Sequence, residues 1–108
     1  AEICGRLEHP GIVPVYGLGY DTKNRPYYAM RFIQGVTLGH AIERLHQPNT
    51  NFTDPEWNVE FRKLIRSFIS VCQTMAYSHA RGIIHRDLKP GNVMLGPYGE
   101  TLVVDWGL

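Results

Sequence analysis

The sequence has few cysteines. Only Cys4 and Cys72 occur among its 108 residues, and they lie far apart in the chain. Their separation fits no metal-ligand spacing and no disulfide framework. We therefore expect both residues to be free thiols that pack as small apolar side chains in a reducing compartment.

Long apolar runs and a strong charge bias are also missing. No run approaches the roughly eighteen apolar residues that suggest a membrane span, so we expect no membrane segment within the chain. The net charge of +1 argues against a nucleic-acid partner, because a broad nucleic-acid footprint needs clustered Lys and Arg side chains. No signal peptide is visible, and we expect a cytoplasmic location, with a membrane segment elsewhere in a longer protein left open.

What is present is typical of one globular unit with a modest core. Hydrophobic residues make up 44% of the sequence and charged residues 19%, which argues against a disordered tail. Runs of β-branched and aromatic residues predict strands over residues 12–20 and 27–33, paired as an antiparallel hairpin. Helical spacing predicts short helices over residues 3–7 and 38–45, and residues 46–55 form a polar loop.

The longest predicted helix runs from about Glu56 to Ala80. Arg81 and Gly82 end it, since a basic last turn followed by a residue tolerant of positive φ is typical of a helix C-terminus. Its apolar side chains keep the i, i+3, i+4 rhythm of one buried face. The predicted buried face comprises Phe61, Leu64, Ile65, Phe68, Cys72, Met75 and Ala76.

A second hairpin is predicted near the end of the sequence. Its strands cover residues 93–95 and 102–104, joined by the turn Gly96–Gly99. Because these strands pair, Asn92 just before the first is expected to lie opposite Asp105 just after the second. The helices and hairpins together predict an α+β fold.

The most informative residues flank this second hairpin. Residues 85–92 read His-Arg-Asp-Leu-Lys-Pro-Gly-Asn, and residues 105–107 read Asp-Trp-Gly. Five fixed residue types at such spacing recur by chance in on the order of one window in a few million. The first stretch fits the H-R-D-L-x-x-x-N catalytic-loop signature of protein kinases, and the second nearly fits D-F-G. The chain resembles the middle of a eukaryotic-type protein kinase domain, in the form found in bacterial serine/threonine kinases, especially a planctomycete-like branch.

The resemblance implies transfer of the γ-phosphate of ATP to Ser or Thr hydroxyls of a protein substrate. Such transfer needs a carboxylate for the attacking hydroxyl, a cation near the phosphate, and ligands for Mg²⁺. Asp87 would accept the hydroxyl proton, and Lys89 would place its ammonium beside the γ-phosphate and Asp87. Asn92 and Asp105 would bind Mg²⁺, since hard oxygen ligands favour that ion over Zn²⁺.

A plainer interpretation exists for each of these residues. A lone Asp or Lys in a loop is usually solvated surface, and a lone His is usually packed in a core. For His85 the resemblance implies this structural role and not that of a base. The complete set of residues favours chemistry for Asp87, Lys89, Asn92 and Asp105.

The resemblance covers essentially all 108 residues and also implies an adenine site. Met30 takes the gatekeeper position at the back of the pocket, and Met94 forms its floor. The backbone carbonyl of Arg31 and the backbone amide of Ile33 would bond the adenine edge. The alternative for both methionines is core filling, and an apolar adenine pocket allows both roles.

Several kinase motifs are absent from the sequence: the Gly-rich phosphate loop, the V-A-I-K lysine and the A-P-E motif. We therefore expect a partial bilobal kinase domain within a longer protein, inactive by itself. Residues 1–33 would be the end of the N-lobe, and residues 34–108 the hinge exit and the start of the helical C-lobe. Two alternatives stay open, a pseudokinase that acts as a scaffold and a small-molecule phosphotransferase with a kinase-like fold.

Overall fold

The computed structural model of the chain describes residues 8–13, 15–30 and 34–106. The strands are β1 (Val15–Tyr20), β2 (Pro26–Met30), β3 (Val36–Thr37), β4 (Val93–Leu95) and β5 (Thr101–Val103). The helices are α2 (Leu38–Leu45), α3 (Pro55–Ala80) and the short 3-10 helix η1 (Pro90–Asn92). Helices and antiparallel strands together confirm the predicted α+β class. The helix predicted over residues 3–7 lies outside the described residues, as does Cys4.

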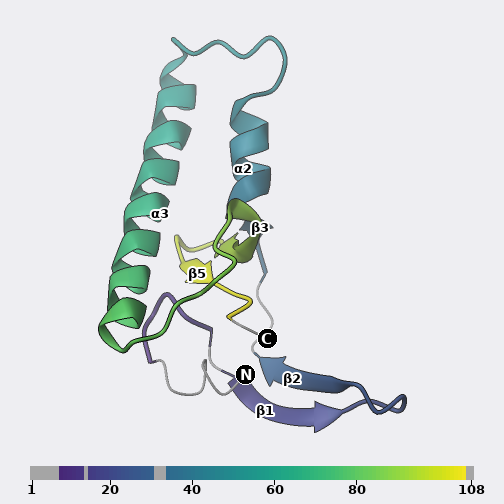
Figure 1. Cartoon of the computed structure of the whole chain (residues 1–108). Coiled ribbons are helices and arrows are strands. Elements are labelled where there is room, and N and C mark those ends of the chain that lie inside the picture. Colours follow the sequence, from purple (N-terminus) through teal and green to yellow (C-terminus); the bar gives the residue numbers. More distant parts are fainter. Residues whose placement is uncertain (1–7, 14, 31–33, 107–108) are drawn as a thin grey trace.

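β1 and β2 form the predicted antiparallel hairpin, which projects away from the helices (Figure 1). The pairing runs from Val15 opposite Met30 to Tyr20 opposite Pro26. The second strand therefore begins one residue earlier than predicted. Its predicted end, residues 31–33, lies outside the described residues.

A second sheet has the strand order β3–β4–β5, with β4 in the centre. The hairpin of β4 and β5 confirms the second predicted hairpin, and it pairs Val93 with Val103 and Met94 with Leu102. Along the outer edge of β5, Ile12 forms a parallel bridge with Val103. The expectation that Ile12 begins the first strand was therefore wrong, because its backbone pairs with the second sheet.

α2 and α3 lie side by side and run in opposite directions (Figure 1). α2 has the predicted bounds because Thr37 caps it, its Oγ1 accepting the N–H of His40 at 3.0 Å. α3 begins with Pro55 after Asp54, whose Oδ1 accepts the N–H of Glu56 at 2.9 Å. None of the helices in the described ranges combines the length and apolar character that a membrane span requires.

The buried face of α3 differs from the predicted one. Five residues of the predicted face are exposed: Phe61, Ile65, Phe68, Cys72 and Ala76. Met75 is buried and Leu64 partly buried, as expected. The other buried side chains of α3 are Val71, Thr74 and Ser78.

Small side chains explain which face of α3 is covered. A Cβ atom at Gly11 would overlap the hydroxyl of Thr74, so the backbone of Gly11 lies directly against the helix. A backbone can approach a helix this closely only on a face without large side chains. The face of α3 that carries Thr74 and Ser78 meets this condition, and the face that carries Phe61 and Phe68 does not. Apolar periodicity cannot find a face that is buried through hydroxyl side chains.

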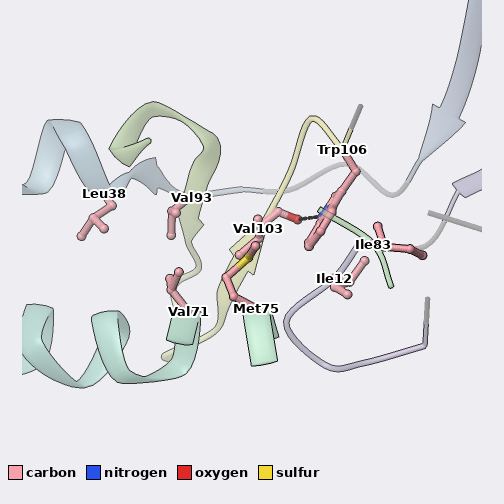
Figure 2. Close-up of a cluster of buried hydrophobic side chains, with 8 residues drawn as sticks. All are labelled: Ile12, Leu38, Val71, Met75, Ile83, Val93, Val103 and Trp106. Atoms are coloured by element: carbon pink, nitrogen blue, oxygen red, sulfur yellow. Dashed lines mark hydrogen bonds between the residues drawn. The ribbon is translucent and has the colours of Figure 1, made fainter. Parts of the chain in front are cut away.

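The core lies between α3 and the β3–β4–β5 sheet (Figure 2). Trp106 is 1% exposed, and its Nε1–H donates to the carbonyl of Val103 at 3.0 Å. The core cluster comprises Ile12, Leu38, Val71, Met75, Ile83, Val93, Val103 and Trp106. Since Ile83 and Trp106 both belong to it, the core fixes where the segment 83–92 begins and where Asp105 follows β5.

The end of α3 generates a first prediction. Gly82 has φ +74°, as its place after the helix predicted, and Gly91 has no positive φ. A Cβ at either glycine would meet nothing within 4 Å. Gly82→Ala should therefore lower the free energy of unfolding by about 1 kcal/mol through backbone strain alone. Gly91→Ala, the matched control, should leave it unchanged or slightly higher. Denaturant titration of both variants measures the difference, and equal effects would contradict the left-handed cap.

Candidate active site

The residues that follow α3 are organised around the ring of His85. This side chain is 1% exposed. Its Nδ1 lies 3.1 Å from the backbone nitrogen of Asp87, and its Nε2 lies 2.7 Å from the carbonyl oxygen of Val104. A backbone N–H can only donate and a carbonyl can only accept, so the proton of the neutral ring sits on Nε2. The structural role expected for His85 is confirmed.

Two further hydrogen bonds close a circuit through the site. The N–H of Val104 donates to the carbonyl of Asn92 at 2.9 Å. The side-chain Nδ2 of Asn92 donates to the carbonyl of Asp87 at 2.8 Å. These hydrogen bonds form a closed circuit through His85, Asp87, Asn92 and Val104. The circuit joins distant parts of the chain, since 19 positions separate His85 from Val104. Sequence reasoning missed Val104, because it contributes backbone atoms that no side-chain motif records.

Asp87 and Lys89 present their charged groups to solvent beside each other. The Nζ of Lys89 lies 3.5 Å from Oδ2 of Asp87, and the side chains are 58% and 65% exposed, respectively. An exposed ion pair of this kind adds little to stability. The Asp87 backbone is fixed by His85 and Asn92, whereas its carboxylate stays accessible, which suits a group that must meet a substrate.

Asn92 and Asp105 lie close in the backbone, but their register differs from the expected one. Val93 pairs with Val103, so Asn92 lies opposite Val104, and Asp105 is one residue further along. The prediction of a directly opposed pair was therefore wrong by one residue, since β5 begins and ends one residue earlier than expected. Asp105 is exposed and has φ +58°.

The donor atoms of this pair fit a hard cation. Asn92 uses Nδ2 to bond Asp87, which leaves Oδ1 for a ligand. The described residues hold no cluster of three or more His, Cys, Asp or Glu side chains arranged for a metal. A two-ligand site suits Mg²⁺, which keeps several waters and is completed by substrate phosphates.

Two of the four non-glycine residues with positive φ in the described part of the chain lie at this site, and the other two are Asn24 and Asn49. Arg86 has φ +79° and Asp105 has φ +58°. Non-glycine residues rarely adopt this region, and such conformations persist only where surrounding contacts enforce them. The two residues lie directly beside His85 and Val104, whose hydrogen bonds supply that enforcement.

The residues predicted to bind adenine are described only in part. Met94 is half-buried in the central strand β4, between Leu102 of β5 and Thr37 of β3. Met30 is the last residue of β2, and Arg31 and Ile33 lie outside the described residues. The adenine contacts therefore stay a prediction.

A hollow in the described residues lies away from these predicted site residues. It has a volume of about 500 Å³ and is lined by α2, α3 and the β4–β5 turn, including Arg44, Leu64 and Leu95. None of the predicted site residues lines it. We place the candidate site at the catalytic-loop residues because the polar groups of Asp87, Lys89 and Asn92 interact there. The size of a hollow does not by itself indicate a reaction.

The circuit around His85 generates a second prediction. His85→Phe keeps a ring against Trp106, whose centroid is 4.7 Å away, but removes both ring hydrogen bonds. The carbonyl of Val104 and the N–H of Asp87 then lose their partners, which should lower the free energy of unfolding by about 1–3 kcal/mol. His40→Phe, at an exposed position of α2, should change it by less than about 0.5 kcal/mol. Denaturation of both variants checks this, and a neutral His85→Phe would refute the bridging role.

Comparison with known proteins shows the family to which the chain belongs. All residues, 1–108, match the sequence profile of the protein kinase domain. The chain is 39% identical over 109 aligned residues to the serine/threonine-protein kinase PknD of Protochlamydia amoebophila, covering 100% of the chain and 11% of that protein. It is 39% identical over 107 residues to PknD of Chlamydia muridarum, covering 99% of the chain and 11% of that protein. Identity to PknD of Chlamydia pneumoniae is 38% over 107 residues.

The chain spans about 11% of the length of these curated relatives. Its small antiparallel sheet and the helices that follow correspond to part of a kinase domain, from the end of the N-lobe sheet into the helical C-lobe. The relatives are bacterial serine/threonine-protein kinases, which confirms the resemblance. The chain belongs to the protein kinase domain family.

Proposed function

We propose that the protein carrying this chain transfers the γ-phosphate of ATP to Ser or Thr hydroxyls of protein substrates. One observation carries the proposal most directly. The backbone of Asp87 is fixed by His85 and Asn92, while its carboxylate is exposed 3.5 Å from the ammonium of Lys89. The names of the relatives support the choice of Ser and Thr as acceptors.

Asp87 and Lys89 would divide the chemical work. A substrate hydroxyl that reaches the Asp87 carboxylate would be oriented for attack and would pass its proton to that group. The ammonium of Lys89 would stabilise charge on the transferred phosphate. Because the backbone of Asp87 is already held, positioning the base requires little reorganisation when the substrate binds.

Asn92 and Asp105 would hold Mg²⁺ through an amide oxygen and a carboxylate. When bound, the ion neutralises charge that develops on the phosphates. The left-handed backbone at Asp105 would be kept by the hydrogen bonds of Val104 on its N-terminal side. Asn92 would serve two functions, since one end of its amide positions Asp87 and the other binds the ion.

The adenine contacts and the lobe boundary complete the proposal. Met30 and Met94 would line the adenine pocket, and the backbone groups of Arg31 and Ile33 would bond the base. Residues 1–33 would close the N-lobe, and residues 34–108 would open the C-lobe. We place the catalytic domain in the cytoplasm, where ATP is available, and propose no nucleic-acid partner.

The proposal predicts unequal effects of two conservative changes in the full-length protein. Asp105→Asn keeps shape and tolerates a positive φ but removes the charge, so the catalytic rate should fall about a hundredfold. Met30→Leu roughly conserves apolar volume and should change the rate less than about threefold. Steady-state kinetics with ATP and a generic protein substrate decide this, with phosphoamino-acid analysis of the product.

Each alternative function gives a distinct result in that assay. Equal losses in the two variants would show that Asp105 is not a metal ligand. A full-length protein that binds ATP but transfers no phosphate would be a pseudokinase. Transfer to small hydroxyl compounds without protein phosphorylation would identify a small-molecule phosphotransferase.

Residues 1–108 alone should transfer little or no phosphate. They contain the base but neither a Gly-rich loop nor a V-A-I-K lysine to hold the phosphates, so positioning of ATP fails. Incubation of the isolated chain with labelled ATP and a generic basic protein tests this. Robust labelling, above that of an Asp87→Asn control, would contradict the expectation.

A further inference from the structure

The connection from α3 to the site is fixed by a Schellman cap. The N–H of Ile83 donates to the carbonyl of Ser78 at 3.1 Å, and the N–H of Gly82 donates to the carbonyl of His79 at 2.9 Å. These two bonds, with Gly82 in the left-handed region, are the defining features of this helix end. Only Ile84 lies between this cap and His85.

Ser78 adds a bond that the cap does not require. Its hydroxyl donates to the carbonyl of Ile83 at 2.6 Å, and its side chain is 0% exposed. In a Schellman cap the residues at these two positions commonly meet through an apolar contact. Here a buried serine takes the place of the apolar residue, so both backbone groups of Ile83 bond to Ser78.

The Ile83 carbonyl held by Ser78 lies two residues before His85 in an extended segment. Ile83 is buried, Ile84 is 66% exposed and His85 is buried again, the alternation of an extended segment. The held carbonyl and the His85 ring are thus separated by a single intervening residue. A turn of the Ile83 peptide would move the ring that bonds Asp87 and Val104.

We propose that Ser78 is a positioning residue for phosphoryl transfer, acting through Ile83 and His85 on the placement of Asp87. This inference rests on the proposed kinase function. Ser78 would touch neither ATP nor substrate, since it is fully buried. Its hydroxyl sets the geometry of the base and leaves the binding of ATP to other residues.

The test compares two serine-to-alanine changes on the same helix in the full-length protein. Ser78→Ala removes the buried hydroxyl. Ser70→Ala is the matched control, since the Ser70 hydroxyl donates to the Arg66 carbonyl within the helix at 3.2 Å and serves no other element. Both variants are assayed at a temperature where denaturation curves show them to be folded.

Ser78→Ala should lower kcat about tenfold and change the KM for ATP by less than about twofold, because a misplaced base slows the chemical step without weakening ground-state binding. Ser70→Ala should match the wild type in both constants. A folded Ser78→Ala protein with wild-type kcat would overturn the proposal. A raised KM for ATP with an unchanged kcat would also overturn it. If Ser78→Ala does not fold, Ser78→Cys replaces it, because its somewhat larger thiol is a weaker donor. Its kcat should fall while its KM for ATP stays unchanged, and a folded Ser78→Cys protein with wild-type kcat would overturn the proposal.

A second measurement separates this proposal from the proposed function. Hydrogen exchange of the peptide spanning residues 83–92 is followed by mass spectrometry in all three proteins. Faster exchange in Ser78→Ala than in the wild type and Ser70→Ala supports the positioning role, even if the wild type phosphorylates no protein. Unchanged exchange overturns it, and an inactive wild type by itself counts only against the proposed function.

Discussion

The site depends on one imidazole ring that joins two segments far apart in the sequence. His85 accepts the amide of Asp87 on one side and donates to the carbonyl of Val104 on the other. Only the neutral tautomer with its proton on Nε2 can make both bonds. Asn92 closes the circuit from Val104 back to Asp87. Removing the ring would leave Asn92 as the remaining hydrogen-bonded link between Asp87 and Val104, the residue before Asp105.

Burial divides the residues of the candidate site into a buried set and an exposed set. His85, Asn92 and Ser78 are at most 5% exposed and each side chain is hydrogen-bonded, whereas Asp87 and Lys89 face solvent. Buried polar groups with complete partners specify one geometry, because every alternative leaves a donor or acceptor unpaired. The exposed groups are then free to meet a substrate without moving their backbone. Phosphoryl transfer depends on charged side chains that a substrate can reach and on a backbone that holds those side chains in place.

Local chemistry explains which parts of the fold could be predicted from sequence. α2 and the end of α3 were predictable because the helix periodicity and Gly82 act within a few residues. The covered face of α3 and the register of the second hairpin depend on contacts with distant segments. Gly11 against Thr74 decides the first of these, and no periodic pattern reports that contact.

The candidate site was predictable as a set of residues but not as a geometry. The motif singled out Asp87, Lys89 and Asn92, and the structure brings Lys89 and Asn92 into contact with Asp87. The positive φ of Arg86 and the part played by Val104 left no trace in side-chain identity, because both are properties of the backbone. Such backbone features appear only once the core has fixed both ends of the loop.

Neutron diffraction from crystals of the kinase domain measures the central interaction directly, because it locates the protons on the ring. We predict a proton on Nε2 of His85 directed at the carbonyl of Val104, and none on Nδ1, which accepts the amide proton of Asp87. A proton on Nδ1, or a ring turned so that Nε2 no longer faces Val104, would contradict the account.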